Sequence, residues 1–143
     1  VYVDENGEKV HPLIIHRSSI GCYERTLAML IEKYAGAFPL WFAPIQARVM
    51  SLTDRTIDNA KAVADKLRYN GFRVEVDTRS EKIGKKIREA QLEKVPYMLI
   101  IGDKEAEQGV VAVRYRSEGD LGTMTLDDLM ARMSEEVRTK KNN

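Results

Sequence analysis

The sequence predicts an α/β protein, in which a mixed, mostly parallel sheet is flanked by helices and follows a separate strand–helix segment. From residue 47 onward, short apolar runs alternate with segments of helical periodicity. Before them, the stretch Gly36 to Pro44 holds a glycine and two prolines, which stop a helix. We therefore expect three parts: a strand and helix over residues 1–36, a connection over 37–46 and a sheet domain over 47–143.

The first part begins with a hairpin arm and a strand. Residues 1–3 are β-prone and precede Asn6-Gly7, a dipeptide typical of hairpin turns. Residues 10–15 are mostly apolar and predict a strand. A helical pattern starts at Gly21, with apolar residues at the spacing of one helix face: Leu27, Leu30, Ile31 and Tyr34. Because no initiator Met is present, we expect a piece of a longer protein.

The sheet domain opens with a βαβ unit. Residues 47–52 predict a strand, residues 54–70 a helix and residues 72–76 a second strand. The helix has one apolar side, made by Ile57, Ala60, Ala64 and Leu67. Gly71 follows it at the position where a left-handed residue ends a helix.

The remaining elements follow from caps and breakers. Ser80 is placed to cap a helix that runs to about Lys94 and buries Ile83, Ile87 and Ala90, and a strand follows over residues 97–101. Gly102-Asp103 predicts a turn, and residues 110–115 predict another strand. Thr125 and Asp128 form a capping box for a final helix. The predicted order of the sheet domain is β-α-β-α-β-β-α.

Composition excludes several classes of protein. The net charge is +1, so binding to nucleic acid would need a local basic face. No apolar run approaches the roughly 20 residues that span a bilayer, and we expect no membrane association. A lone Cys22 and the absence of a signal peptide favour the cytoplasm. No Gly-x-Gly-x-x-Gly or P-loop is present, which argues against a nucleotide site of those types.

Five segments together resemble the class II aminoacyl-tRNA synthetases, and specifically the C-terminal part of the bacterial threonyl-tRNA synthetase family. Residues 11–25 are similar to motif 3 in its threonine-specific form, and residues 38–46 to the junction with the anticodon-binding domain. The other segments match later family motifs: residues 79–89, 95–105 and 120–124. The resemblance covers the whole chain and implies a catalytic-domain remnant followed by an anticodon-binding domain.

The resemblance implies roles for four residues of the first part. His16 corresponds to one of three zinc ligands, whose partners lie earlier in the parent, and Arg25 to an ATP contact. Gly21 and Cys22 correspond to substrate-binding positions, although relatives commonly carry Ser where Cys22 stands. On the residues alone, a structural histidine, a surface ion pair of Arg25 and a packing role for Cys22 are the alternatives. We expect no zinc, ATP or magnesium bound to this piece.

In the second part the resemblance implies anticodon contacts by Arg88, Glu105, Arg114 and Ser80. Arginine can donate paired hydrogen bonds to base carbonyls, and a carboxylate can accept from a base N–H. The alternatives are a solvated basic face for Arg88, an ordinary acidic turn residue for Glu105 and an N-cap for Ser80.

Members of this family activate threonine with ATP and charge threonine tRNA. The resemblance therefore implies a fragment of such a ligase that recognises the anticodon and carries the motif 3 residues. The fragment alone should be inactive, because other catalytic motifs and the homodimer interface are missing. The alternatives are a tRNA-binding or regulatory module without catalysis and, less favoured, a small-molecule-binding domain.

Overall fold

A computed structural model describes residues 1–19 and 21–142 of the chain. Its elements in chain order are β1 (Tyr2–Val3), β2 (Lys9–Val10), α1 (Tyr23–Tyr34), β3 (Ala47–Ser51), the 3-10 turn η1 (Asp54–Thr56), α2 (Ile57–Tyr69), β4 (Val74–Asp77), α3 (Ile83–Leu92), β5 (Tyr97–Ile101), α4 (Asp103–Gln108), β6 (Val110–Tyr115), β7 (Gly119–Thr125) and α5 (Leu126–Thr139). The predicted fold class, an α/β sheet flanked by helices, is confirmed.

Five strands form one mixed sheet in the order β4-β3-β5-β6-β7. Strands β4, β3 and β5 run parallel, because a helix crosses over between each strand and the next one along the chain. Strands β6 and β7 are antiparallel to their neighbours. The inner parallel strands β3 and β5 are buried on both faces, whereas the edge strand β4 exposes Glu75.

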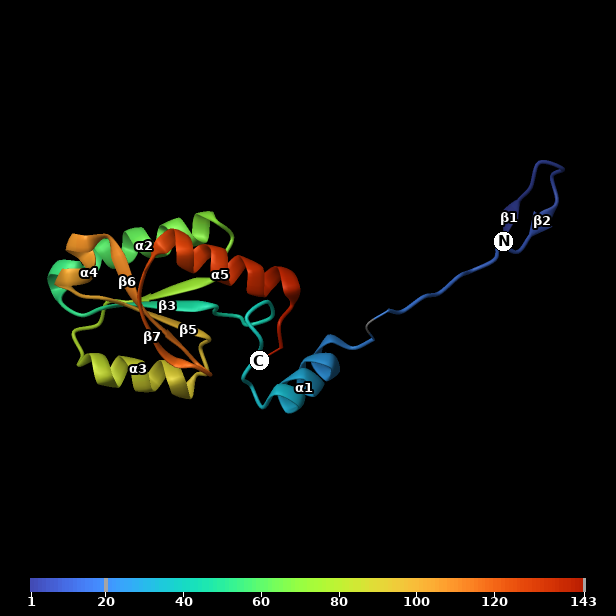
Figure 1. Cartoon of the computed structure of the whole chain (residues 1–143). Coiled ribbons are helices and arrows are strands. Elements are labelled where there is room, and N and C mark those ends of the chain that lie inside the picture. Colours follow the sequence, from blue (N-terminus) through green and yellow to red (C-terminus); the bar gives the residue numbers. More distant parts are fainter. Residues whose placement is uncertain (20, 143) are drawn as a thin grey trace.

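Helices cover the two faces of this sheet unequally (Figure 1). Helices α2 and α5 lie on one face and α3 on the other. Strand residues Val49, Leu99 and Val113 point to the α2–α5 face and belong to the larger core cluster. Met50 and Met98 point to the opposite face and pack with Ala90 and other apolar residues of α3.

The α3 face remains open over β6 and β7. Along β6, Val111, Val113 and Tyr115 are buried, whereas the alternate residues Ala112 and Arg114 are half-exposed. Alternate residues of a strand point to opposite faces, so the half-exposed pair lies on the α3 face. The structure therefore leaves a solvent-accessible strip of sheet beside α3.

The predicted strand over residues 10–15 is wrong beyond Val10. Strands β1 and β2 pair as a short antiparallel hairpin, but residues 11–18 have no regular structure. Leu13, Ile14 and Ile15 are between 87% and 97% exposed. Within the described residues no strand runs beside them, and a strand without a hydrogen-bonded neighbour is unstable. The hairpin lies apart from the sheet domain (Figure 1).

Two predictions in the sheet domain are also wrong, and one strand was missed. Ser80 does not cap α3, which begins at Ile83 after Lys82, without a side-chain cap. Gly102 begins the short helix α4 rather than a turn, so Glu105 is helical. Strand β7 was not predicted, because two glycines and polar residues interrupt its apolar alternation, and a bulge opposite β6 breaks its register.

Two predicted helix ends are confirmed. Gly71 follows α2 with φ +86°, a conformation that glycine adopts without strain. The Thr125 hydroxyl accepts a hydrogen bond from the backbone N–H of Asp128 at 3.1 Å and begins α5. None of the helices in residues 1–19 and 21–142 has the length and apolar character that crossing a membrane requires.

Candidate nucleic-acid interface

A crevice lies at the carboxyl ends of β3 and β4. From β3 the chain leads to α2 on one face, and from β4 it leads to α3 on the other face. Ligands of open α/β sheets bind at such a switch point. The crevice encloses about 420 Å³ and is lined by Ser51, Leu52, Thr53, Asp54, Arg79, Ser80, Glu81 and Lys82. The structure thus places Ser80 in a polar crevice, next to the exposed Lys82.

The open strip of sheet carries Arg114. Its Cα is paired in register with Met98 of β5, a residue that packs under α3. The Arg114 Nε is buried and has no hydrogen-bond partner within the described residues. A buried polar group without a partner is rare in native proteins and points to a missing ligand or water. Arg114 is therefore available to an incoming acceptor.

Helix α3 presents Arg88 on the same side of the molecule. Ile83, Ile87 and Ala90 pack on the sheet, and Glu89 and Glu93 reach toward β4. With 100° between successive helical residues, Arg88 then lies on the exposed flank away from β4. Arg88 and Arg114 therefore border one face, formed by α3 and the open strip. We call this the α3–β6 face.

Glu105 is not brought together with those two arginines. Its Oε2 atom accepts a hydrogen bond from the backbone N–H of Gly102 at 3.0 Å, and the residue is half-buried. It borders a hollow with Asn59 and Val63 of α2. Within the described residues no contact joins Glu105 to Arg88 or Arg114. One of its carboxylate oxygens therefore serves as a helix cap.

Lys86 is the main feature that the sequence analysis missed. The sequence analysis did not single it out, but its side chain is only 2% exposed. The Nζ atom donates to the carbonyl oxygens of Ser51 at 2.9 Å and Asp77 at 3.2 Å. The signal was its place on the helix, three residues after Ile83 and one before Ile87, on the flank nearer the core.

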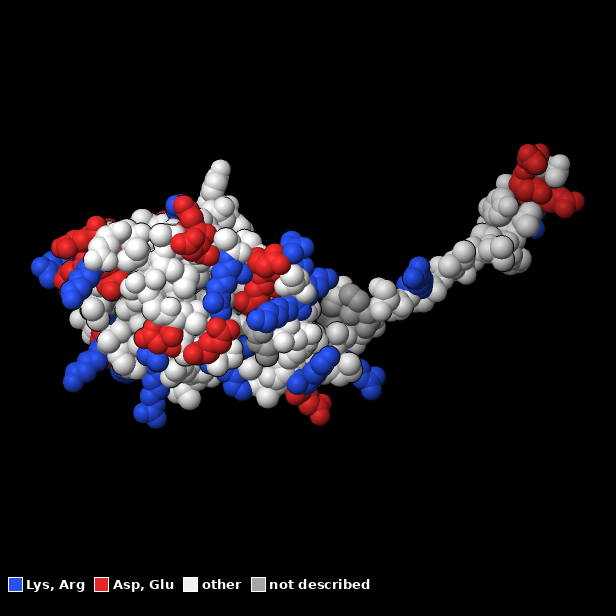
Figure 2. Space-filling model, viewed as in Figure 1, with Lys and Arg blue, Asp and Glu red and all other residues white. Residues whose placement is uncertain are grey.

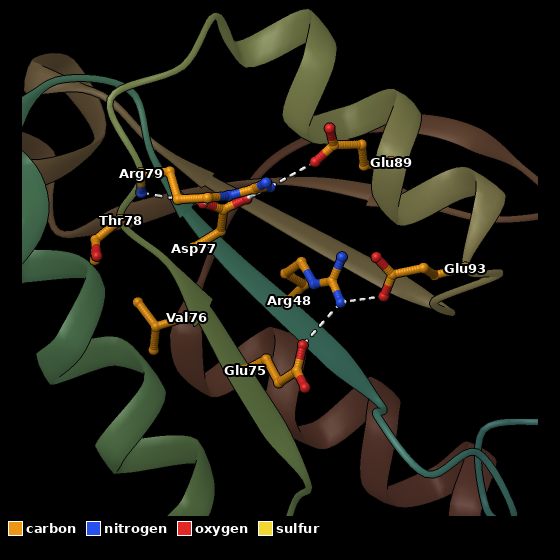
Figure 3. A pocket seen from close by; sticks show the side chains of 8 residues that line it. All are labelled: Arg48, Glu75, Val76, Asp77, Thr78, Arg79, Glu89 and Glu93. Atoms are coloured by element: carbon orange, nitrogen blue, oxygen red, sulfur yellow. Dashed lines mark hydrogen bonds and ion pairs between the residues drawn. The ribbon is translucent and has the colours of Figure 1, made fainter.

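A second cleft of about 280 Å³ lies between α3 and the edge strand β4 (Figure 3). Arg48, which is 7% exposed, donates to Glu75 at 2.8 Å and to Glu93 at 2.5 Å. These contacts raise the pKa of Arg48, with the hydrogen bond to Glu93 contributing most. The same hydrogen bond lowers the pKa of Glu93.

Arg79 neutralises the other end of this cleft. It donates to both carboxylate oxygens of Asp77, at 3.0 and 2.6 Å, and to Glu89 at 2.6 Å (Figure 3). The hydrogen bonds from Arg79 hold the pKa of Asp77 below its ordinary value. Each charged side chain that lines the cleft has an oppositely charged partner. The cleft is therefore an internal ion-pair network that supports α3.

Basic side chains project from the outer side of α3 (Figure 2). Lys82, Lys85 and Arg88 are exposed there, and Lys85 is paired with Glu81 at 2.7 Å. Within the described residues, no ion pair neutralises Lys82 or Arg88. Arg88 therefore adds positive charge beside the α3–β6 face, and Lys82 adds it at the switch-point crevice.

The four candidate residues of the first part lie on an exposed segment. His16, Gly21, Cys22 and Arg25 are all exposed, and Gly21 has φ +75°. The Cys22 thiol donates to a carboxylate oxygen of Glu24 at 2.8 Å, which lowers the pKa of Glu24. Within the described residues, no side-chain hydrogen bond or ion pair joins any two of these four residues.

The described residues do not make a zinc site around His16. They contain no group of three or more His, Cys, Asp or Glu side chains that could hold a metal ion. Structural and catalytic zinc sites need three or four converging protein ligands. This chain therefore supplies one imidazole and does not by itself fit the zinc that the resemblance implies.

The class of protein is shown by a comparison with protein families: it is a nucleic-acid-binding domain. A family model described as the anticodon binding domain matches residues 46–136. The chain belongs to this family. The matched region contains the α3–β6 face, the switch-point crevice and the sheet.

The relatives found by sequence are threonine–tRNA ligases. The enzyme of Clostridium perfringens is 57% identical over 141 residues, which cover 99% of this chain and 22% of that protein. A Clostridium botulinum enzyme is 56% identical over 140 residues, 98% of this chain and 22% of that protein. The chain thus spans about a fifth of the length of these relatives. The predicted resemblance to this family is confirmed.

A solved structure agrees with this assignment. The RNA binding domain of threonyl-tRNA synthetase from Cryptosporidium parvum superimposes with a TM-score of 0.76 and 38% sequence identity. The match covers 79% of this chain and 28% of that chain. Sequence similarity to the ligases extends beyond the anticodon-binding model into the first 45 residues. This extension disfavours the alternative of a stand-alone tRNA-binding module.

Proposed function

We propose that the chain is part of a threonine–tRNA ligase and that its α3–β6 face recognises the anticodon loop of threonine tRNA. The observation that supports this most directly is the placement of Arg88 and Arg114 on one open face, with the Arg114 Nε lacking a protein partner. A single-stranded loop exposes base edges, and arginine offers planar donors to guanine and uracil oxygens.

The surroundings of this face suit RNA. Lys82 and Ser80 in the crevice can donate to phosphate oxygens without reading the sequence. Glu105 can accept from a base N–H through its second carboxylate oxygen, while the first holds Gly102.

The catalytic role is proposed for the parent enzyme. There, His16 would hold zinc together with ligands from earlier in the chain, Arg25 would contact ATP with its magnesium, and Gly21 and Cys22 would border threonine. The exposed apolar residues Leu13, Ile14 and Ile15 support this proposal, because an uncovered apolar segment marks a missing contact. We also propose that the parent is a cytoplasmic homodimer, with its interface outside this chain.

A fluorescence titration with a labelled threonine anticodon stem-loop tests the RNA proposal. We expect binding that weakens at least tenfold in Arg88→Ala and in Arg114→Ala. Lys61→Ala is a matched control, because Lys61 is an exposed cation on α2, across the sheet. Equal affinity for a stem-loop with an unrelated anticodon, unchanged by either arginine variant, would refute specific recognition.

The catalytic proposal has its own test. The chain by itself should show no threonine-dependent exchange of pyrophosphate into ATP, whereas the parent enzyme should show it. In the parent, Arg25→Ala should abolish the exchange while leaving anticodon stem-loop affinity within twofold. Full exchange activity in the Arg25→Ala parent would refute the assignment of Arg25 to the ATP site.

A further inference from the structure

The carboxyl ends of two helices meet at the boundary between the two parts of the chain. Helix α1 ends at Tyr34 and is followed by Ala35, and α3 is followed by Glu93 and then by Lys94. The Nζ atom of Lys94 donates to the carbonyl oxygen of Ala35, and the Lys94 stem runs beside Gly36. A cation at a helix C-terminus is favourable, because the last carbonyls carry partial negative charge.

Both residues of this contact have strained backbones. Ala35 has φ +48° and Lys94 has φ +59°. Within residues 1–19 and 21–142, only one other non-glycine residue, Lys140, has positive φ. Glycine is the usual residue at such helix ends, because it has no Cβ to clash. A glycine at position 94 would relieve the backbone strain, but it has no side chain that could donate to the carbonyl oxygen of Ala35. The lysine therefore makes this contact at the expense of a strained φ angle.

Arg116 closes the same junction from the sheet. Its guanidinium donates to the carbonyl oxygens of Lys94 at 2.8 Å, Ala37 at 3.2 Å and Phe38 at 3.0 Å. Three backbone carbonyls from two segments thus converge on one half-buried side chain. Lys94 and Arg116 together form what we call the junction clamp.

The clamp is continuous with the elements that carry the candidate RNA contacts. Arg116 follows Arg114 by two residues at the end of β6, and Lys94 follows Arg88 by six at the end of α3. On the other side, α1 buries no residue fully, and its last residue, Tyr34, packs edge-on against Phe38 with the ring centroids 6.1 Å apart. The described restraints on α1 therefore lie at its C-terminus, where the clamp acts together with this ring contact. Arg25 lies ten residues earlier on the same helix, about 15 Å along its axis.

We propose that Lys94 and Arg116 are positioning residues that hold α1 in a fixed orientation on the sheet domain, so that RNA bound at the α3–β6 face stabilises α1. The proposal rests on the proposed function for its RNA ligand. The two states that RNA would bias are a closed clamp and an open one. Coupling between sites requires such a two-state element, to which both sites contribute.

Amide hydrogen exchange of the full 143-residue chain, with and without the threonine anticodon stem-loop, tests the coupling. The reporters are the amides of Ala35, Gly36 and Ala37, which bond to carbonyls within or at the end of α1. In the unsubstituted chain, saturating RNA should slow their exchange at least threefold.

Lys94→Gly is the decisive variant. It removes the ammonium group, and glycine adopts the positive φ of position 94 without strain. We therefore expect the fold to be retained, and circular dichroism checks this. RNA affinity should fall by about the factor of the lost slowing, at least threefold, because coupling between two sites is reciprocal, and the RNA-dependent slowing should disappear. Arg116→Gln should also lose the RNA-dependent slowing of exchange. Lys94→Arg keeps a cation of similar reach and should retain at least half of this slowing.

The outcomes separate the two proposals. No binding of the stem-loop by the unsubstituted chain would overturn the proposed function, and this inference with it. Binding without any change in exchange at Ala35, Gly36 and Ala37 would overturn the coupling alone. Undiminished slowing in Lys94→Gly would likewise show that the clamp does not transmit RNA binding.

Discussion

The ammonium nitrogen of Lys86 lies 2.9 Å from the carbonyl oxygen of Ser51, and both residues are buried. The same nitrogen donates to the carbonyl oxygen of Asp77 at 3.2 Å and lies 3.9 Å from its carboxylate. One side chain of α3 thus joins the carboxyl ends of β3 and β4. Because these ends border the switch-point crevice, Lys86 sets the position of α3 there.

Lys86→Met should lower the free energy of unfolding by about 2–4 kcal/mol, because it leaves two buried carbonyl oxygens without their donor and removes one of the two cations beside the Asp77 carboxylate. Methionine keeps most of the stem, so little of the loss should come from a cavity. Urea denaturation measures the change. Lys85→Met is the matched control, since Lys85 is exposed and its pair with Glu81 is a surface pair; it should cost less than about 1 kcal/mol. Equal losses in the two variants would contradict the assigned role of Lys86.

Acid should weaken the fold through Asp77. The hydrogen bonds from Arg79 lower the pKa of this carboxyl in the folded chain below the 3.8 of an unperturbed aspartate. As the pH falls, the unfolded chain therefore takes up a proton first, and stability is lost from about pH 4 downward. In Asp77→Asn, the difference in the free energy of unfolding between pH 7 and pH 3 should be smaller.

Asp58→Asn is the control for this pH effect, because Asp58 is exposed on α2. It should show the same loss between pH 7 and pH 3 as the unsubstituted chain. Urea melts at the two pH values provide the measurement. An Asp77→Asn chain that lost as much stability in acid as the unsubstituted chain would rule out Asp77 as a source of acid sensitivity.

Local patterns were sufficient to predict most of the sheet domain. Apolar periodicity predicted α2, α3 and α5, and continuous apolar runs predicted β3 and β5, because burial on the sheet dictates both signals. Strand β7 was missed because an edge strand with one open face needs few apolar residues. The strand expected over residues 10–15 was wrong because its apolar run has no partner strand within the described residues.

The candidate site was less predictable than the fold. Exposure of Arg88 followed from the helical wheel, but the unpartnered Nε of Arg114 depends on side-chain packing across β5 and β6. The position of Lys86 on α3 indicates the flank nearer the core, but its contact with Ser51 and the junction clamp join residues 22 to 79 positions apart. No local pattern encodes such contacts, because they arise only when the elements are assembled.

Tyr97 should make the fold sensitive to alkali. Burial raises the pKa of its hydroxyl, which donates to Glu136 at 2.9 Å. A raised pKa in the folded state gives stability that is complete below the unfolded value of about 10 and is lost as the pH rises above it. Tyr97→Phe should therefore lose less stability between pH 8 and pH 11, measured by urea denaturation.

Tyr69→Phe controls for general effects of alkali, since Tyr69 is 92% exposed. Its loss of stability between pH 8 and pH 11 should match that of the unsubstituted chain. If Tyr97→Phe and Tyr69→Phe declined equally, the alkaline sensitivity would have to come from groups other than the buried hydroxyl.

Lys82 and Arg114 should affect RNA binding in different ways. Lys82 is exposed beside the crevice, so Lys82→Met should weaken all stem-loops alike and reduce the slope of log affinity against log salt by about 0.7, the value for one phosphate contact on a single strand. Arg114→Met should instead reduce discrimination between the threonine anticodon and an altered one, by about 1–3 kcal/mol, with little change in slope. Titrations at several salt concentrations with both loops separate these effects, and Lys61→Met should change neither. A loss in Arg114→Met that was the same for both loops would show that Arg114 contacts the backbone and does not read a base.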